Sequence, residues 1–535
     1  MANKTLFSNR RGRAAQADTR NAAGGRAYTR DNEEALAQYA LTGTFNGTLH
    51  ASAKSQLDTV LKLLKGADDE FVAKLAIYAR AEGFMKDVPS FLVAWLAAQK
   101  SPYFERAFVA VIDNGKMLRN FVQYIRSGVL GRKSFGSRIK RSIQNWFAER
   151  DVNGLFRAIP GNDPSLVDIV KMVHPKGDRE HKAFYAWLLG KDVKENTDSY
   201  SVKTRDGWRK LPKLVCEFED FKRYDTDAPK IPFQLLTGMD LDKKHWNAIA
   251  RDAKWMMTRM NLNTFLRHGV LEDKEMVNLI AQRLGNRELV RKARQFPYQI
   301  FTSLFAIKNQ VPDEIYEALQ DALDASLENV PTFEGKKVSV CIDTSGSMKW
   351  GAPMGGSRGN GRSEIKHIDV AALFASAILR NNPGSVVIPF DTTVHATERF
   401  NRRDSVWTNS QKLRKYGGGG TALGSAMQHV RQNHADTDLT IFISDNESWA
   451  DRQYGFRGRG TSLAEEFDKF KRQKKDTKLV LLDIEASTNT QAKTKKDVLN
   501  VGGFSDRVFD VVKTFADGEL DGAHLVNFVK ETVSL

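Results

Sequence analysis

The chain has 535 residues, of which 41% are hydrophobic and 10% aromatic, and its formal net charge is +16. This composition indicates a folded protein of two or three domains and excludes a disordered chain. No apolar run approaches the roughly 18 residues that a membrane-spanning helix needs, so we expect no membrane partner. Cys216 and Cys341 are the only cysteines, which excludes a disulfide framework and favours a reducing, cytoplasmic location.

The first 30 residues are rich in arginine and poor in acidic side chains. They lack the apolar core of a secretory signal, although an Arg-rich organelle transit peptide is an alternative interpretation. Because such a segment has little apolar surface to bury, we predict a flexible basic arm over residues 1–30.

Residues 31–330 show apolar side chains at helical spacing in many short segments, as Phe71, Leu75 and Tyr78 illustrate. The main expected helices cover residues 34–39, 55–64, 70–81, 90–98, 103–112, 165–173, 180–189, 244–260, 275–284, 287–294 and 313–327. Many short helices in succession, without a clean repeat motif, predict helix pairs stacked as an irregular solenoid.

Positive charge is concentrated in this helical region. Residues 1–330 hold 52 Lys and Arg against 40 Asp and Glu, whereas residues 331–535 hold 29 against 25. From residue 116 to residue 150 there are nine basic residues and one acid, Glu149. A solvated surface is one interpretation, but solvated helices usually mix the two signs, so a polyanionic partner is favoured.

Within residues 136–150, Ile139, Ile143 and Trp146 share one helical face with Phe147, which predicts that the aromatic rings belong to the core. The cations then face outward, where they can neutralise phosphates. A second basic segment lies around Pro175 and contains Lys171, His174 and Lys176. The candidate phosphate-binding residues are Arg119, Arg126, Arg132, Lys133, Arg138, Lys140, Arg141, Lys171, His174 and Lys176.

Pro and Gly near residues 328–335 predict a linker, after which the pattern changes. Strands are expected at 337–343, 385–391, 439–445 and 479–484, and helices at 365–380, 422–430, 463–472 and 522–532. Such alternation predicts a second domain, residues 331–535, with a parallel-dominated, doubly wound sheet covered on both faces.

The first expected strand ends in Asp343, and two hydroxyls follow at Ser345 and Ser347. Open α/β sheets place ligands at the carboxyl ends of their strands. Mg²⁺ prefers about six oxygen ligands, so one loop supplies too few. Further oxygens follow at Thr421, after four glycines, and at Asp445, after another apolar strand. The sequence therefore predicts a divalent-cation site, with Mg²⁺ as the expected ion.

The ordered set of Asp343, Ser345, Ser347, Thr421 and Asp445 resembles the metal-ion-dependent adhesion site of von Willebrand factor A (vWA) domains. That resemblance implies that the three hydroxyls bind the ion directly and that the two carboxylates bind it directly or through water.

Four segments of the helical region resemble motifs of the TROVE module: residues 39–45, 172–176, 262–270 and 293–299. A TROVE module followed by a vWA domain makes up the SS-A/Ro ribonucleoproteins, and the resemblance covers nearly everything after residue 30. It implies a monomeric ring of HEAT-like helical repeats closed by the vWA domain. It also implies binding of small noncoding Y-like RNA on an outer basic surface. Single-stranded ends of misfolded RNA are expected to pass through the central hole, and bacterial relatives are linked with exoribonucleases.

The leading functional hypothesis is an RNA-binding protein without catalysis, which acts in RNA quality control or as a nuclease tether. A second hypothesis is a metal-dependent protein-binding scaffold that acts through the vWA site. A phosphatase is a third hypothesis, but that chemistry needs a second carboxylate where this chain has Ser345. The glycine loop also lacks the Lys-Ser/Thr ending of a P-loop. We therefore expect no enzyme.

Overall fold

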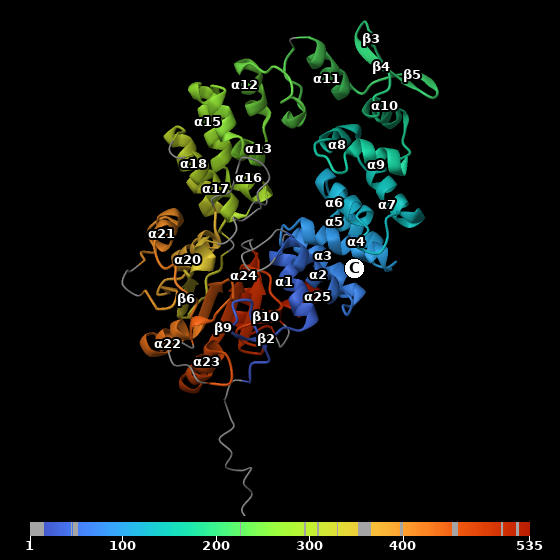
Figure 1. Cartoon of the computed structure of the whole chain (residues 1–535). Helices are drawn as coiled ribbons and strands as arrows, with labels where there is room; N and C mark the ends of the chain where they lie inside the picture. The colour runs from blue at the N-terminus through green and yellow to red at the C-terminus, as the bar shows by residue number, and fades with distance from the viewer. Residues whose placement is uncertain are drawn as a thin grey trace, which may run out of the picture.

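The computed structural model describes residues 15–43, 45, 52–224, 226–293, 296–307, 310–328, 330–350, 365–395, 400–451, 458–503, 507–520 and 524–535. Along the described chain a helical region is followed by an α/β region (Figure 1). None of the described helices is long and apolar enough to cross a membrane.

The first half of the helical region consists of short helices packed side by side. Polar side chains begin several of them: Asp68, for example, accepts a hydrogen bond from the Phe71 amide at 3.0 Å and so caps the helix that follows. The helices are α1 (Asn32–Thr42), α2 (Ala53–Leu64), α3 (Asp69–Ala81), α4 (Asp87–Ala98), α5 (Phe104–Val111), α6 (Gly115–Arg126), α7 (Gly136–Ala148), α8 (Val152–Arg157), α9 (Leu166–Val173) and α10 (Arg179–Leu188).

The second half of the helical region begins with a small sheet and continues with helices. The strands are β3 (Val193–Asn196), β4 (Ser199–Thr204) and β5 (Gly207–Lys210), which the sequence analysis did not predict. The helices are α11 (Lys213–Arg223), η1 (Phe233–Leu235), α12 (Lys243–Asp252), α13 (Trp255–Met260), α14 (Leu262–Arg267), η2 (Val270–Glu272), α15 (Lys274–Gly285), α16 (Arg287–Ala293), α17 (Pro297–Ile307) and α18 (Asp313–Ala325).

The helices form an arc whose two ends both contact the α/β region (Figure 1). At one end α1 packs on β11 (Val498–Gly502) and α25 (His524–Thr532), and α3 also contacts α25. At the other end α17 contacts α20 (His367–Asn381), and α18 contacts α21 (Val406–Leu413). At the far side of the arc, the rings of Phe221 on α11 and His245 on α12 lie 5.3 Å apart. The elements therefore close into a ring.

The α/β region is built on five parallel strands in the order β11-β9-β8-β6-β7. The remaining strands of this sheet are β6 (Val338–Asp343), β7 (Val386–Phe390), β8 (Leu439–Ser444) and β9 (Lys478–Asp483). The other helices of the region are α19 (Gly346–Trp350), α22 (Leu423–Asn433), α23 (Ser462–Gln473) and α24 (Val508–Asp517).

Alternate residues of each strand bury their side chains in different layers. Val340 and Ile441 pack in the core that α20 and α24 share with the helical region, whereas Cys341 and Phe442 pack in the core beneath α22 and α23. A sheet covered on both faces explains the continuous apolar runs of β6 and β8. The predicted fold class, stacked helices joined to a doubly wound parallel sheet, is confirmed.

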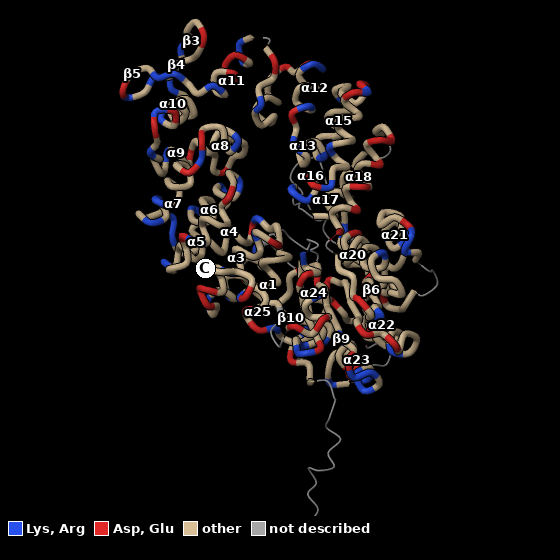
Figure 2. Tube along the Cα trace, turned by 180° about the vertical axis from the view of Figure 1, so that it is seen from behind, with Lys and Arg blue, Asp and Glu red and all other residues tan. Residues whose placement is uncertain are grey.

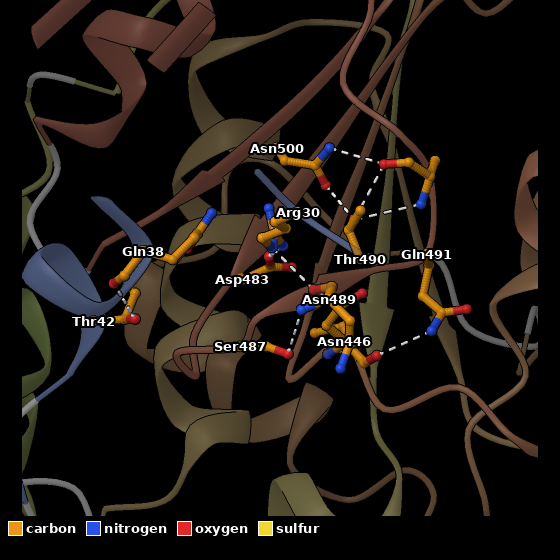
Figure 3. Close-up of polar contacts among 12 residues, drawn as sticks. Arg30, Gln38, Thr42, Asn446, Asp483, Ser487, Asn489, Thr490, Gln491 and Asn500 are labelled. Atoms are coloured by element: carbon orange, nitrogen blue, oxygen red, sulfur yellow. Dashed lines mark hydrogen bonds and ion pairs between the residues drawn. The ribbon is translucent and has the colours of Figure 1, made fainter. Parts of the chain in front are cut away.

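The predicted flexible arm is wrong for residues 15–30. β1 (Thr19–Arg20) pairs with β2 (Arg26–Thr29), which pairs in turn with β10 (Asn489–Thr490) of the α/β region. The Arg30 side chain forms a buried ion pair with Asp483 and donates to the Asn489 carbonyl at 2.9 Å (Figure 3). Composition alone predicted disorder, because it carries no information on the distant residues with which this short segment forms strand pairs and an ion pair. Residues 1–14 of the predicted arm lie outside the described residues.

Candidate functional site

The two predicted metal-binding aspartates lie at the same edge of the parallel sheet. Asp343 ends β6, and Asp445 directly follows β8, which is the neighbour of β6. The chain leaves β6 toward β7 on one side and later returns to β8 on the other, so this edge is the topological switch point of the sheet. Ligand sites of open α/β sheets form at that point.

Both carboxylate oxygens of Asp343 accept hydrogen bonds. The Ser345 amide donates to Oδ1 at 2.9 Å, and the Ser444 hydroxyl donates to Oδ2 at 2.7 Å. The Oγ atoms of Ser345 and Ser347 lie 3.1 Å apart. The loop after β6 therefore presents one carboxylate and two adjacent hydroxyls.

The glycine loop before Thr421 packs directly against this first loop. The Gly346 amide donates to the Gly419 carbonyl at 2.8 Å, and the Gly418 amide donates to the Thr344 carbonyl at 2.8 Å. Gly417 has φ +76°, and a Cβ there would lie 2.1 Å from the Thr344 carbonyl oxygen. A side chain at this position would push the two loops apart, so glycine is required for their close approach.

Asp445 completes the cluster. Its Oδ1 accepts from the Glu447 amide at 3.3 Å, while its buried Oδ2 has no hydrogen-bond partner within the described part of the chain. Burial and the neighbouring Asp445 charge raise the pKa of Asp343. Two buried carboxylates, one with an unsatisfied oxygen among the described residues, beside the hydroxyls of Ser345 and Ser347 suit a hard divalent cation, which favours oxygen ligands. The residues present therefore fit Mg²⁺.

The candidate phosphate-binding residues differ in their exposure to solvent. Six of those named in the sequence analysis are exposed, and we call them the outer basic surface: Arg126, Lys133, Arg141, Lys171, His174 and Lys176. Figure 2 shows Lys and Arg positions on α7 and α9 at the outer edge of the ring.

The remaining four candidates are half-buried, and three of them are engaged within the protein. Arg119 donates to the Ala158 carbonyl at 2.9 Å, and burial lowers its pKa. Arg132 donates to the backbone carbonyls of Ser134 and Phe135 at 2.9 and 2.8 Å. Lys140 is also half-buried.

The prediction that Arg138 faces outward as a free cation is wrong. Its guanidinium forms a two-pronged ion pair with Glu105 on α5 and donates to the Lys100 carbonyl at 3.0 Å. The Arg138 guanidinium lowers the pKa of Glu105 and keeps that carboxylate ionised. Because Glu105 neutralises it, Arg138 joins α7 to α5 rather than offering a free charge.

Gln144 brings the two basic segments together. Its side-chain amide donates to the Val173 carbonyl at 2.7 Å and to the His174 carbonyl at 3.3 Å. His174 ends α9 with φ +51°, the left-handed conformation that stops the helix. Arg141 lies one turn before Gln144 on α7, so it neighbours the end of α9.

The sequence analysis missed residues that hold both sites. Ser444 holds Asp343, and Asp391 accepts from the Gly419 amide at 3.1 Å and so anchors the glycine loop. Asp391 directly follows β7, so its position after an apolar strand was a usable signal. No comparable signal pointed to Glu105 or Gln144.

Two family models match the chain. One described as the Ro60 vWA domain matches residues 337–516, and one described as the TROVE domain matches residues 222–321. A curated relative, RNA-binding protein RO60 of Deinococcus radiodurans, is 23% identical over 539 residues, which cover 94% of this chain and 96% of that protein.

The crystal structure of the Deinococcus radiodurans RO (RSR) protein shares the fold. It aligns with a TM-score of 0.60 and 17% sequence identity, and covers 91% of this chain and 100% of that one. Both matches span the helical and the α/β regions together. The chain therefore belongs to the TROVE-domain Ro family, in which a helical TROVE part is followed by a vWA domain of the Ro60 type.

Proposed function

We propose that this protein is a non-catalytic RNA-binding component of a ribonucleoprotein, which binds small noncoding Y-like RNA on its outer basic surface. The proposal rests on four exposed cations at the place where Gln144 of α7 binds the end of α9: Arg141, Lys171, His174 and Lys176. Two acids of this region are engaged within the protein: Glu105 pairs with Arg138, and Asp168 accepts from the Ser165 hydroxyl at 2.6 Å. The exposed cations are therefore available for phosphates.

The relative named RNA-binding protein RO60 supports the same class of ligand. A-form duplex RNA is recognised mainly by its shape and its phosphates, which suits a convex helical surface that offers lysine and arginine. The closed ring supports a further part of the proposal: the single-stranded 3′ end of a misfolded RNA passes through the centre while its duplex rests outside. Such a protein serves RNA quality control, either alone or as a tether for an exoribonuclease.

The test is a gel-shift titration of a structured Y-like RNA with Arg141→Glu/Lys171→Glu. Lys62→Glu/Lys65→Glu is the matched control, because both lysines are exposed at the C-terminal end of α2, outside the outer basic surface, and the change in net charge is the same. We expect the first variant to lose at least about tenfold in affinity and its salt dependence to fall by about one unit of slope for each lost phosphate contact. Equal affinity of the two variants at low and high salt would remove the RNA assignment for this surface.

The Oδ2 of Asp445 has no hydrogen-bond partner among the described residues, and this favours a second function, metal-dependent protein binding. Ser345, Ser347 and Thr421 would hold Mg²⁺ directly, and Asp343 and Asp445 directly or through water. A bound ion would offer an open coordination position to a carboxylate of a partner protein. Asp343→Ala should then abolish Mg²⁺ binding in calorimetric titrations and Mg²⁺-dependent partner recovery, with RNA affinity unchanged. Unaltered Mg²⁺ binding by the variant would exclude this site.

A further inference from the structure

The small sheet between α10 and α11 has two faces of different character. Residues that alternate along an antiparallel strand point to opposite faces, and paired residues point to the same face. Val193 pairs with Val202, and Glu195 pairs with Tyr200, so these side chains share one face. Tyr200 and Val202 are buried, and the Tyr200 hydroxyl donates to Asp220 of α11 at 2.8 Å. This face packs on α10 and α11.

The opposite face is exposed to solvent and carries lysines and a tryptophan. Lys194 pairs with Ser201, which pairs with Lys210, and Lys203 pairs with Trp208. The three lysines and Trp208 are exposed, and none of the paired residues on this face is acidic. Figures 1 and 2 show the three strands at the outer edge of the ring. We call this face the strand platform: Lys194, Asn196, Ser201, Lys203, Trp208 and Lys210.

The tryptophan is the informative residue of the platform. Lysines on exposed strands are a common means of preventing sheet edges from aggregating, so on their own they indicate no ligand. An exposed tryptophan has the opposite effect, because it offers apolar surface to any neighbour. Trp208 is 45% exposed, and the ammonium of Lys194 lies 4.8 Å from its ring centroid. The Lys194 ammonium therefore lies over one part of the ring, while nearly half of the Trp208 side chain stays open to solvent.

Two of the four acids around the platform are paired with groups outside it, whereas Asp192 and Asp198 are exposed. Glu195, on the packed face, is bound to Tyr224 at 2.8 Å and to Arg223 at 3.3 Å. Asp206, in the turn between β4 and β5, pairs with Arg209 at 2.9 Å. The platform thus combines a planar aromatic surface with three flanking cations.

We propose that the strand platform binds single-stranded RNA: a base stacks on Trp208, and Lys194, Lys203 and Lys210 neutralise the adjacent phosphates. Aromatic stacking combined with backbone neutralisation is the general mode by which proteins hold single strands, and a sheet face is a recurrent support for it. Asn196 and the buried Ser201 add polar groups: the Asn196 amide donates to the Ser201 hydroxyl at 2.9 Å. The platform lies outside the segment matched by the TROVE model, which begins at residue 222. The inference rests on the proposed RNA-binding function and adds a second contact to it.

The experiment measures fluorescence anisotropy of a labelled twelve-nucleotide oligouridine with the full-length protein. Trp208→Ala should weaken binding by about tenfold, whereas Trp208→Phe, which keeps an aromatic face, should stay within about threefold of wild type. Trp449→Ala is the matched control, because Trp449 is similarly exposed (42%) but lies on the α/β region. Trp449→Ala should bind as wild type.

A charge variant tests the lysines. Lys194→Glu/Lys203→Glu should lower the slope of log affinity against log salt by about 1.4, since each phosphate contact to a single strand contributes roughly 0.7. Lys62→Glu/Lys65→Glu again controls for net charge. Photocross-linking of 4-thiouridine RNA should label the peptide that contains residues 199–210.

Several outcomes overturn the proposal. The first is that Trp208→Ala binds oligouridine as tightly as wild type does. The second is that the cross-links fall only on other peptides. The third is that polyglutamate, at the same concentration of charge, displaces oligouridine. If Arg141→Glu/Lys171→Glu loses structured RNA while Trp208→Ala keeps oligouridine, the platform assignment fails and the proposed function stands. If the wild-type protein binds neither RNA, both fail.

Discussion

Arg30 and Asp483 form a buried ion pair that joins the segment before α1 to the carboxyl end of β9. Burial raises the pKa of Asp483 even beside this guanidinium. Removing one partner of a buried pair leaves the other charge without compensation, which costs about 3–5 kcal/mol. Arg30→Met should therefore lower the free energy of unfolding by about that amount in denaturant titrations at pH 8.

The same variant should show a defined pH dependence. Without Arg30, the folded-state pKa of Asp483 rises further above its unfolded value, so the stability contribution of this carboxyl is lost as the pH rises. The loss caused by Arg30→Met should then be smaller at pH 5.5 than at pH 8. Arg30→Met/Asp483→Leu removes both charges and should recover much of the stability at both pH values. A pH-independent loss would contradict this account.

The raised pKa of Asp343 predicts how the stability of the metal-free protein depends on pH. Its folded-state pKa lies above the unfolded value, through burial and the Asp445 charge, so its stability contribution is present at acidic pH and lost as the pH rises through the raised pKa. Mg²⁺ must displace that proton, so its binding should tighten over the same range. In thermal melts, the stabilisation by Mg²⁺ relative to EDTA should grow from pH 5 to pH 8. Asp343→Asn should flatten this trend.

Gly417 and Gly418 form a natural comparison in the glycine loop. Both have positive φ, but only at Gly417 would a Cβ collide with the Thr344 carbonyl; at Gly418 no atom of the described residues lies within 4 Å of it. Gly418→Ala should cost only backbone strain, about 1–3 kcal/mol, and leave Mg²⁺ affinity nearly unchanged. Gly417→Ala should cost more and weaken Mg²⁺ binding, because Thr421 moves away from Asp343. Calorimetry of both variants checks the difference, and equal Mg²⁺ affinities would show that the loop contact is unimportant.

Arg138 and Arg141 lie on the same helix but should behave differently. The Arg138–Glu105 pair is partly exposed, so Arg138→Leu should cost at most about 1 kcal/mol of stability and leave RNA affinity within about twofold. Arg141→Leu should leave the melting temperature unchanged and weaken the RNA complex severalfold. Parallel thermal melts and gel shifts measure both effects. A stronger RNA defect in Arg138→Leu would mean that RNA displaces Glu105.

Patterns that repeat locally were predictable from the sequence. β6 and β8 were recognised because buried parallel strands read as continuous apolar runs, and Asp343 and Asp445 were recognised because each follows such a run. β11 was missed because Asn500 interrupts its apolar run. That side chain is buried, and its amide donates to the Ala492 carbonyl at 2.9 Å and to the Thr494 hydroxyl at 2.8 Å.

Features that depend on distant partners were not predictable. Glu105 neutralises Arg138 from 33 positions earlier in the chain, and Asp483 meets Arg30 from 453 positions later. Charge counting treats such residues as free. The strands β3 to β5 were missed for another reason: one of their faces is polar, and the runs are too short for alternation to stand out from a loop.

The packing of α25 on α1 and α3 has a consequence for biosynthesis. The ribosome makes α25 after the helical region and the parallel sheet, so α1 and α3 gain this neighbour long after they themselves have been made. β2 waits in the same way for β10. Contacts of such sequence separation form slowly, so we expect the ring to close only after the strands β10 and β11 of the α/β region have been made.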